Sequence, residues 1–238
     1  MSSAAPILIT GVGKRAGLHL AQTFLGRGQP VIGTFRSDRP ALAGLREAGA
    51  TLLRCDFSND QELQELPALI GAETTRLRAI IHNASDWVAE GGEVAPATVF
   101  QRMMRVHAEA PYLLNLALTP LLEAQAPAAA DIIHLGDYVS ARGSRKHIAY
   151  AASKAAQDNL TLSFAARLAP AVKVNSIAPA LIAFNEHDGE AYRAKALTKS
   201  LLQREGGWEE LQHQVDYLLN SRYVTGRIIA MDGGRHLV

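Results

Sequence analysis

The sequence contains only one cysteine, Cys55, so no disulfide can form within the chain. A lone thiol fits a reducing compartment, where disulfides rarely persist, and we expect it to fill part of the core. The chain also lacks any run of the roughly 18 apolar residues that a membrane-spanning helix needs. Its N-terminus, MSSAAPILITGVG, has no basic flank and leads into a glycine turn, which predicts a strand rather than a signal peptide. We therefore expect a cytoplasmic protein without a membrane partner.

An excess of either charge is absent too. Lysine and arginine number 24 against 23 aspartates and glutamates, which gives a formal net charge of +1. Proteins that bind nucleic acid through a broad basic face carry a clear positive excess, so nucleic acid is not an expected partner. Any phosphate group should instead be bound by a few well-placed arginines.

What the sequence does contain is a series of short apolar runs of strand length. They begin at Pro6, Pro30, Thr51, Arg78, Asp131, Val172 and Gly226. Longer segments with helical periodicity separate them, and this alternation predicts βαβ units around a parallel sheet. The expected fold is α/β, a single-domain doubly wound (Rossmann) sheet of about seven strands with helices on both faces. Residues 1–238 are expected to form that one domain, and the alanine-rich segment near Pro127 is predicted to be a loop.

A glycine-rich turn lies between the first apolar run and an apolar helix. Its residues are Thr10, Gly11, Val12, Gly13, Lys14, Arg15, Ala16 and Gly17. Backbone N–H groups in such a turn, together with the positive end of the helix, can bind a pyrophosphate. Because the turn follows a strand and opens a helix, it favours a nucleotide site over an ordinary surface turn.

The turn resembles the TGxxxGxG motif of the short-chain dehydrogenases/reductases. Three later motifs are similar to those of the same family: YxxxK from Tyr150 to Lys154, VNSIAPA from Val174, and DGG from Asp232. The resemblance therefore covers nearly the whole chain and implies a nicotinamide cofactor at the glycine turn.

The end of the second apolar run indicates which nicotinamide cofactor is bound. Arg36 and Ser37 stand where an acidic residue would favour NAD by binding the ribose 2′-hydroxyl. A guanidinium and a hydroxyl suit the additional 2′-phosphate, so NADPH is expected, unless Arg36 only caps a solvated loop beside Asp38. Asn83 has an alternative role as a brace between central strands. The resemblance implies the following cofactor-binding residues: Gly11, Lys14, Arg15, Gly17, Arg36, Ser37, Asp56, Phe57, Asn83, Ala84, Ser85, Tyr150 and Lys154.

The YxxxK element and one aspartate form the predicted catalytic group. Tyr150 and Lys154 lie four residues apart, which places them on one face of a helix, and the lysine charge should lower the pKa of the phenol. Asp137 stands 13 residues before Tyr150, where most family members carry a serine. We predict Tyr150, Lys154 and Asp137 as catalytic, although an aspartate at a strand end can also cap the next turn.

Three departures from the common family pattern resemble the pteridine reductases: Arg15 in the turn, Asp137, and Trp87 directly after HNASD. A carboxylate accepts hydrogen bonds from the amino edge of a pterin, and an indole stacks on its ring, although Trp87 has the alternative role of anchoring its loop. HNASDW and DYVSARGSRKHIAYAASK also resemble the bacterial dihydromonapterin reductases. The substrate-binding residues implied are Arg15, Ser85, Trp87, Asp137 and Tyr150, with no metal site.

The resemblance thus implies NADPH-dependent reduction of a C=N bond in a 7,8-dihydropterin, such as dihydromonapterin, with dihydrofolate as a further substrate. Family members are usually tetramers, so a homotetramer is expected. Two alternatives stay open: a short-chain carbonyl or 3-oxoacyl reductase, and a non-catalytic NADP-binding regulator.

Two features leave their role undecided at this level. His107 replaces the assisting asparagine of the family, and is either part of a proton relay or a hydrogen-bonded buried histidine. The irregular segment from Ala183 to Gly207 either covers the site or forms a solvated pair of helices.

Overall fold

The computed structural model describes residues 4–126, 128 and 130–238, so the loop predicted near Pro127 lies partly outside the described residues. Every predicted apolar run contains a strand. The strands are β1 (Ile7–Ile9), β2 (Val31–Phe35), β3 (Thr51–Arg54), β4 (Ala79–His82), β5 (Ala130–Leu135), β6 (Val172–Pro179) and β7 (Ile228–Met231). They form one parallel sheet in the order β3-β2-β1-β4-β5-β6-β7. The predicted doubly wound α/β fold is confirmed.

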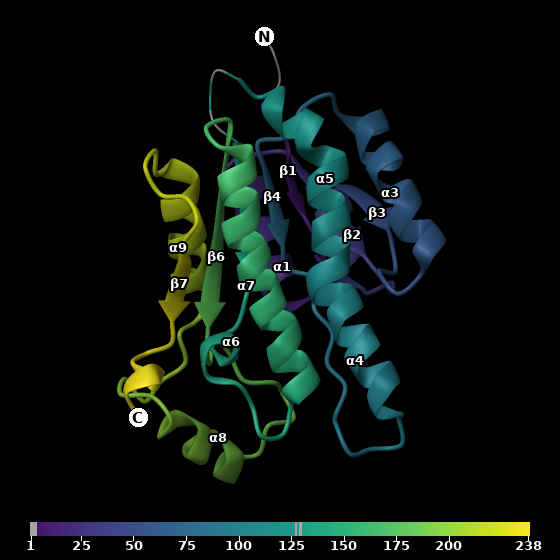
Figure 1. The fold of residues 1–238 in the computed structure, drawn as a ribbon. Helices are drawn as coiled ribbons and strands as arrows, with labels where there is room; N and C mark the ends of the chain where they lie inside the picture. Colours follow the sequence, from purple (N-terminus) through teal and green to yellow (C-terminus); the bar gives the residue numbers. More distant parts are fainter. Residues whose placement is uncertain (1–3, 127, 129) are drawn as a thin grey trace.

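Helices cover both faces of this sheet, and Figure 1 shows one layer in front of it. That front layer consists of α3 (Asp60–Glu73), α5 (Ala110–Glu123) and α7 (Ile148–Leu168). The opposite face is covered by α1 (Arg15–Gly26), α2 (Ala41–Glu47) and α9 (Trp208–Asn220).

Alternation along the strands explains why the sheet has two apolar faces. In β1, the buried side chain of Leu8 packs in the core cluster of α3, α5 and α7, whereas Ile7 and Ile9 pack in the cluster of α1, α2 and α9. Successive side chains of a strand point to opposite faces, so a continuous apolar run is required when both faces are covered. Cys55 directly follows β3 and is part of the front cluster, as expected of a core thiol.

The remaining short helices lie mostly at the carboxyl ends of the strands. They are α4 (Pro96–Met104), the π-helical turn η1 (Arg105–Glu109), α6 (Val139–Arg142), α8 (Glu190–Leu197) and the 3₁₀ helix η2 (Arg235–Leu237). In Figure 1, α6 and α8 lie below the arrowheads of β6 and β7, at the edge where ligands bind in sheets of this kind. Among the described helices, none combines the length and apolar character needed to cross a bilayer.

Candidate active site

A cleft of about 1480 Å³ opens at the carboxyl edge of the sheet. Of all the residues predicted to bind cofactor or substrate or to act in catalysis, only Gly17 does not line it. The segment after β6 also lines the cleft, through Ala183, Asn185, Tyr192, Thr198 and Lys199. The segment from Ala183 to Gly207 therefore covers the site rather than forming a solvated pair of helices.

The glycine turn is held in place by the loop after β4. The side-chain amide of Asn83 donates to the carbonyl oxygens of Thr10 and Gly11, at 2.9 and 2.8 Å. The hydroxyl of Thr10 in turn accepts from the backbone N–H groups of Asn83 and Ala84. Asn83 therefore braces the glycine turn against the loop after β4, the structural role considered beside cofactor binding. It also lines the cleft.

Gly17 acts through packing rather than by facing the cleft. A Cβ atom at this position would lie 2.3 Å from the carbonyl oxygen of Gly11 and 2.4 Å from Nδ2 of Asn83. The first turn of α1 therefore fits against the glycine turn only without a side chain. No side chain caps the N-terminus of α1, so its backbone N–H groups remain available to an anion.

Basic side chains surround the turn. Arg36 lies 3.2 Å from Asp86, which also accepts from Arg102 at 2.6 Å, so Arg36 is tied to the loop after β4. The side chain of Arg39, a residue that the sequence motifs did not indicate, packs against the turn. If Gly13 carried a Cβ atom, that atom would lie 3.2 Å from Cδ of Arg39. Arg39 lines the cleft beside Arg36 and is a second candidate for a phosphate ligand.

Arg15 links the glycine turn to the segment that covers the site. Its guanidinium donates to the carbonyl oxygen of Ala183 at 2.8 Å and to Oδ1 of Asn185 at 2.7 Å. It also lies 5.3 Å from the ring centre of Trp208. The backbone of Arg15 has a φ of 52°, an unusual value for a residue other than glycine.

The predicted catalytic residues converge in the cleft. The hydroxyl of Tyr150 donates to Oδ2 of Asp137 at 3.0 Å, and the N–H of Val139 donates to Oδ1 at 2.9 Å. Lys154 is buried, with Nζ donating to the carbonyl oxygen of Leu135 at 2.7 Å. Asp137 therefore caps the turn before α6 through Oδ1, which is the structural role considered for it from the sequence. Its other oxygen, Oδ2, still accepts from Tyr150.

The protonation of this group differs from the sequence-based expectation. Burial raises the pKa of Tyr150, and the negative charge of Asp137 raises it further, so the expected lowering by Lys154 is wrong for this structure. Burial also raises the pKa of Asp137, against hydrogen bonds and positive charges that lower it. Burial lowers the pKa of Lys154 to about 8, partly offset by Asp137 and Asp158. Tyr150 is therefore a neutral phenol, and Asp137 holds a proton more readily than an exposed carboxyl.

His107 lies behind the site, buried at the centre of the π-helical turn η1. Its Nε2 accepts from the backbone N–H of Asp86 at 3.3 Å, and an amide can only donate, so Nδ1 carries the ring proton of the neutral form. The Ser85 hydroxyl, 2.8 Å from Nε2, must then donate to it, while Nδ1 donates to Ser153 at 2.9 Å. Ser85 consequently keeps its lone pairs for a donor in the cleft. Burial, followed by the charge of Lys154, lowers the pKa of His107, which keeps the ring neutral.

Trp87 stands at the open side of the cleft. Its side chain is 54% exposed and makes an edge contact with His147, whose ring centre lies 5.2 Å away. His147 also lines the cleft and was missed by the sequence reasoning, because nothing in the pattern links it to Trp87. The indole thus keeps exposed surface on which a flat ring can stack.

The chain is similar to known proteins over almost its entire length. The family described as enoyl-(acyl carrier protein) reductase matches residues 11–236. A dihydromonapterin reductase from Klebsiella pneumoniae is 59% identical over 232 residues, 98% of this chain and 97% of that protein. A dihydromonapterin reductase from Citrobacter koseri is 54% identical over the same shares of both chains.

Solved structures match as well. The crystal structure of FolM alternative dihydrofolate reductase 1 from Brucella suis, in complex with NADP, superposes with a TM-score of 0.87 at 25% identity. The match covers 100% of this chain and 97% of that one. Both sets of relatives agree with the resemblance that the sequence motifs indicated.

Proposed function

The chain belongs to the short-chain dehydrogenase/reductase family, and we propose that it reduces 7,8-dihydropterins with NADPH, with dihydromonapterin as substrate and dihydrofolate as a second substrate. The relatives named dihydromonapterin reductase support this substrate, and the relative solved with NADP supports the cofactor. The observation that carries the proposal is the partly buried carboxyl of Asp137, which accepts a hydrogen bond from Tyr150 within the cleft.

The residues at the glycine turn fit the proposed cofactor. The uncapped N-terminus of α1 and the turn from Gly11 to Lys14 would hold the pyrophosphate, and Arg36, Ser37 and Arg39 would hold the 2′-phosphate. When bound, NADPH supplies a hydride to C6 of the dihydropterin.

The chain's own residues would then position the ring and supply the proton that N5 takes up. Trp87 would stack on the ring, and Ser85, as an acceptor, would bind one of its N–H groups. The pair formed by Asp137 and Tyr150 would hold the proton, since burial raises the pKa of both groups. Arg15 would bind substrate from the side of the covering segment.

The catalytic position offers no support for the carbonyl-reductase alternative. The nearby hydroxyl of Ser140 donates to Oδ2 of Asp158 at 2.5 Å, and Ser140 does not line the cleft. Ser140 therefore does not take the place of Asp137 toward a ketone.

The test is NADPH consumption with 7,8-dihydromonapterin, 7,8-dihydrobiopterin, dihydrofolate, ketones and 3-oxoacyl thioesters. We expect turnover of the dihydropterins and little of the carbonyl compounds. Turnover of ketones alone would identify a carbonyl reductase, and tight NADPH binding without any turnover would identify a regulator.

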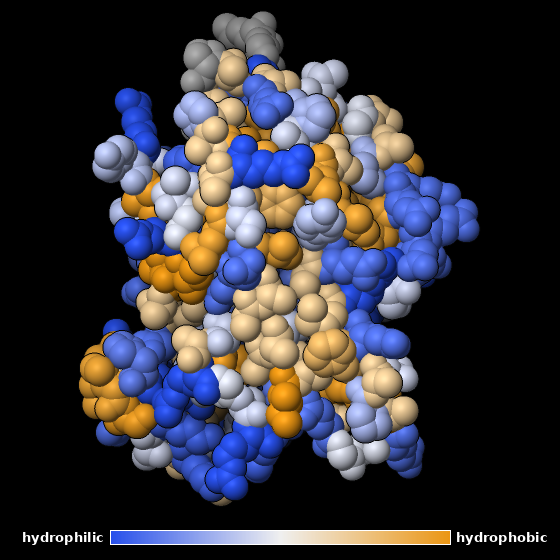
Figure 2. Space-filling model, in the orientation of Figure 1, coloured by the Kyte–Doolittle hydropathy of each residue, from blue (hydrophilic) through white to orange (hydrophobic). Residues whose placement is uncertain are grey.

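We also propose that the protein is a homotetramer in the cytoplasm. Figure 2 shows hydrophobic residues running down the middle of the face formed by α5 and α7. Tyr112, Leu113 and Leu162 are exposed there, at 44%, 37% and 47%. Exposed apolar side chains clustered on neighbouring helices favour burial against another copy of the chain.

A further inference from the structure

The lining of the cleft carries far more positive charge than the protein as a whole. The chain is nearly balanced, with 24 basic and 23 acidic residues. The acidic side chains that line the cleft are Asp56, Asp86 and Asp137, and Val238 at the end of the chain lines it as well. The basic residues that line it are Lys14, Arg15, Arg36, Arg39, Arg142, Arg145, Lys146, Lys154, Lys199 and Arg235. An electrostatic bias of this size indicates that the cleft binds anionic groups.

One part of this charge is accounted for by the proposed cofactor. Lys14, Arg15, Arg36 and Arg39 follow β1 and β2, beside the glycine turn. NADPH carries roughly four negative charges on its pyrophosphate and 2′-phosphate at neutral pH. These four cations are therefore matched, and Lys154 is buried beneath Tyr150.

A second group of cations lies at the substrate end, and we call Arg145, Lys146, Lys199 and Arg235 the basic rim. Arg145 and Lys146 belong to the loop that ends at His147, the residue in contact with Trp87. Lys199 follows α8 in the covering segment. All four residues line the same cleft as Trp87, and Arg145 and Lys146 directly precede its contact residue His147.

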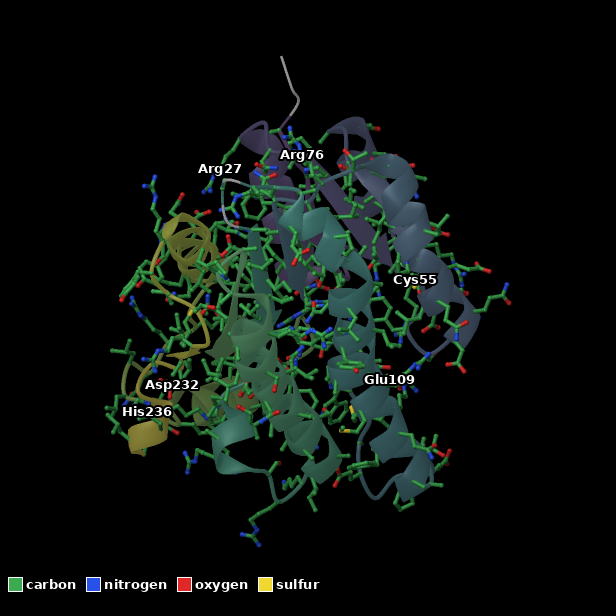
Figure 3. The ribbon with its side chains drawn as sticks, turned by 45° about the horizontal axis from the view of Figure 1, so that its top comes forward. Arg27, Cys55, Arg76, Glu109, Asp232 and His236 are labelled. Atoms are coloured by element: carbon green, nitrogen blue, oxygen red, sulfur yellow. The ribbon has the colours of Figure 1, made fainter. Side chains whose placement is uncertain are left out.

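Arg235 belongs to the C-terminal turn and is held close to the catalytic carboxyl. Its guanidinium lies 4.3 Å from the ring centre of Tyr138, and its positive charge partly offsets the rise that burial causes in the pKa of Asp137. The turn itself is fixed by Asp232, which accepts from Nδ1 of His236 at 2.8 Å, and Figure 3 shows these two side chains next to each other. Arg142 ties the turn to α6 through the backbone oxygens of Arg235 and Val238, and we assign it this structural role.

The rim is not neutralised within the part of the chain that the structure describes. No salt bridge of the described residues involves Arg145, Lys146, Lys199 or Arg235. Of the aspartates in the cleft, Asp86 is paired with Arg36 and Arg102, and Asp56 accepts from Ser58. Several cations that form no salt bridge in the described residues and line one cleft repel each other until an anion binds among them.

We propose that the basic rim is a subsite for an anionic tail on the C6 substituent of the dihydropterin, either a phosphate ester or the carboxylates of a glutamate tail. This inference rests on the proposed function. A pterin ring held by Trp87 and Asp137 would share the cleft with the rim residues, so a long C6 substituent could reach them. The rim therefore increases the affinity for charged substrates over the uncharged side chain of dihydromonapterin.

The test compares the KM values of wild-type protein and the double variant Arg145→Gln/Lys146→Gln. The substrates are 7,8-dihydromonapterin, its phosphate ester, dihydrofolate, and dihydrofolate with added γ-glutamates. Lys195→Gln is the matched control, because Lys195 lies on α8 but does not line the cleft. We expect the double variant to raise the KM of the anionic substrates about fivefold, since each exposed charge contributes modestly. The KM of dihydromonapterin, kcat and the NADPH dissociation constant should stay unchanged.

Comparing the phosphate and glutamate substrates identifies which anion the rim prefers, and added salt should weaken the binding of both anionic substrates more than that of dihydromonapterin. Equal KM values for charged and uncharged substrates in wild type and variant would overturn the inference while leaving the proposed function intact. Absence of turnover with every dihydropterin would overturn the proposed function, and the inference with it.

Discussion

Burial sets the charge of individual residues in the candidate site. Tyr150 and Asp137 are partly buried acids and hold their protons more tightly, whereas Lys154 is a buried base and holds its proton less tightly. The hydrogen bond between Tyr150 and Asp137 fits this arrangement, because a neutral phenol donates and a carboxylate accepts. Proton transfer in such a pair depends on the pKa values that burial and neighbouring charges impose, not on the pKa values of the free side chains.

The lowered pKa of Lys154 predicts opposite effects of pH on activity and on stability. Above about pH 8 the folded protein loses this charge, so activity that depends on the ammonium should fall. The unfolded chain keeps the proton up to the ordinary value of 10.5, so the free energy of unfolding should rise over the same interval. Steady-state rates and thermal melts across this interval measure the two trends.

Lys154→Met provides the control for this pH dependence. It removes the titrating group, so the stability of the variant should lack the rise seen in wild type between about pH 8 and 10.5. Identical pH slopes for the two proteins would contradict the lowered pKa of Lys154.

His107 gives a second prediction for a single residue. His107→Leu removes the acceptor of the Ser85 hydroxyl, so Ser85 can turn its proton toward the cleft and no longer act only as an acceptor. We expect kcat/KM for dihydromonapterin to fall about tenfold, with little change in the dissociation constant of NADPH.

His107→Gln is the conservative partner of that variant, since an amide oxygen can again accept from Ser85. It should recover most of the lost activity. If both variants lose activity equally, and in proportion to a lower melting temperature, His107 has only a structural role.

Among the helices and strands, the close contact between α1 and the glycine turn leads to a matched pair of substitutions. Gly17→Ala would place a methyl group within 2.4 Å of Gly11 and Asn83, so it should weaken NADPH binding at least tenfold and lower the melting temperature. Gly26→Ala, in the same helix, meets no atom within 4 Å and should stabilise the protein by about 0.5–1 kcal/mol. NADPH titration and thermal melts of both variants provide the measurement. An unchanged NADPH affinity in Gly17→Ala would contradict the packing role.

The strands were predictable because every one is a short apolar run between helical segments. β7 is the least buried, yet its run from Gly226 still indicated a strand. The π-helical turn at Arg105–Glu109 was not predictable, because the turn buries His107 against Ser85 and Ser153, residues distant in sequence. Such contacts depend on the tertiary fold and leave no local periodicity.

The candidate site was predictable where a motif carried it, and less so elsewhere. Tyr150, Lys154 and Asp137 meet in the cleft, as the spacing indicated. Arg39 was missed because it stands outside any motif and reaches Gly13 only through its long side chain. The contact of Arg15 with Ala183 was also unpredictable, since it joins positions 168 residues apart.

For the molecule as a whole, the proposed tetramer predicts that a charge on the exposed face of α7 disrupts assembly. Leu162→Arg should shift the protein to a smaller species in size-exclusion chromatography with light scattering, because burying an unpaired charge is costly. Leu69→Arg on α3 is a control of equal exposure, 47%, and should leave the assembly intact. A monomeric wild-type protein would refute the tetramer directly.

The central claim is that the Asp137 carboxyl takes part in reducing a dihydropterin, and Asp137→Asn tests it most directly. The amide keeps the shape of the side chain but cannot carry the proton. In a single turnover with bound NADPH and 7,8-dihydromonapterin, we predict a rate at least about 100-fold below wild type, with an unchanged NADPH dissociation constant. A variant that reduces dihydromonapterin at the wild-type rate would contradict the account.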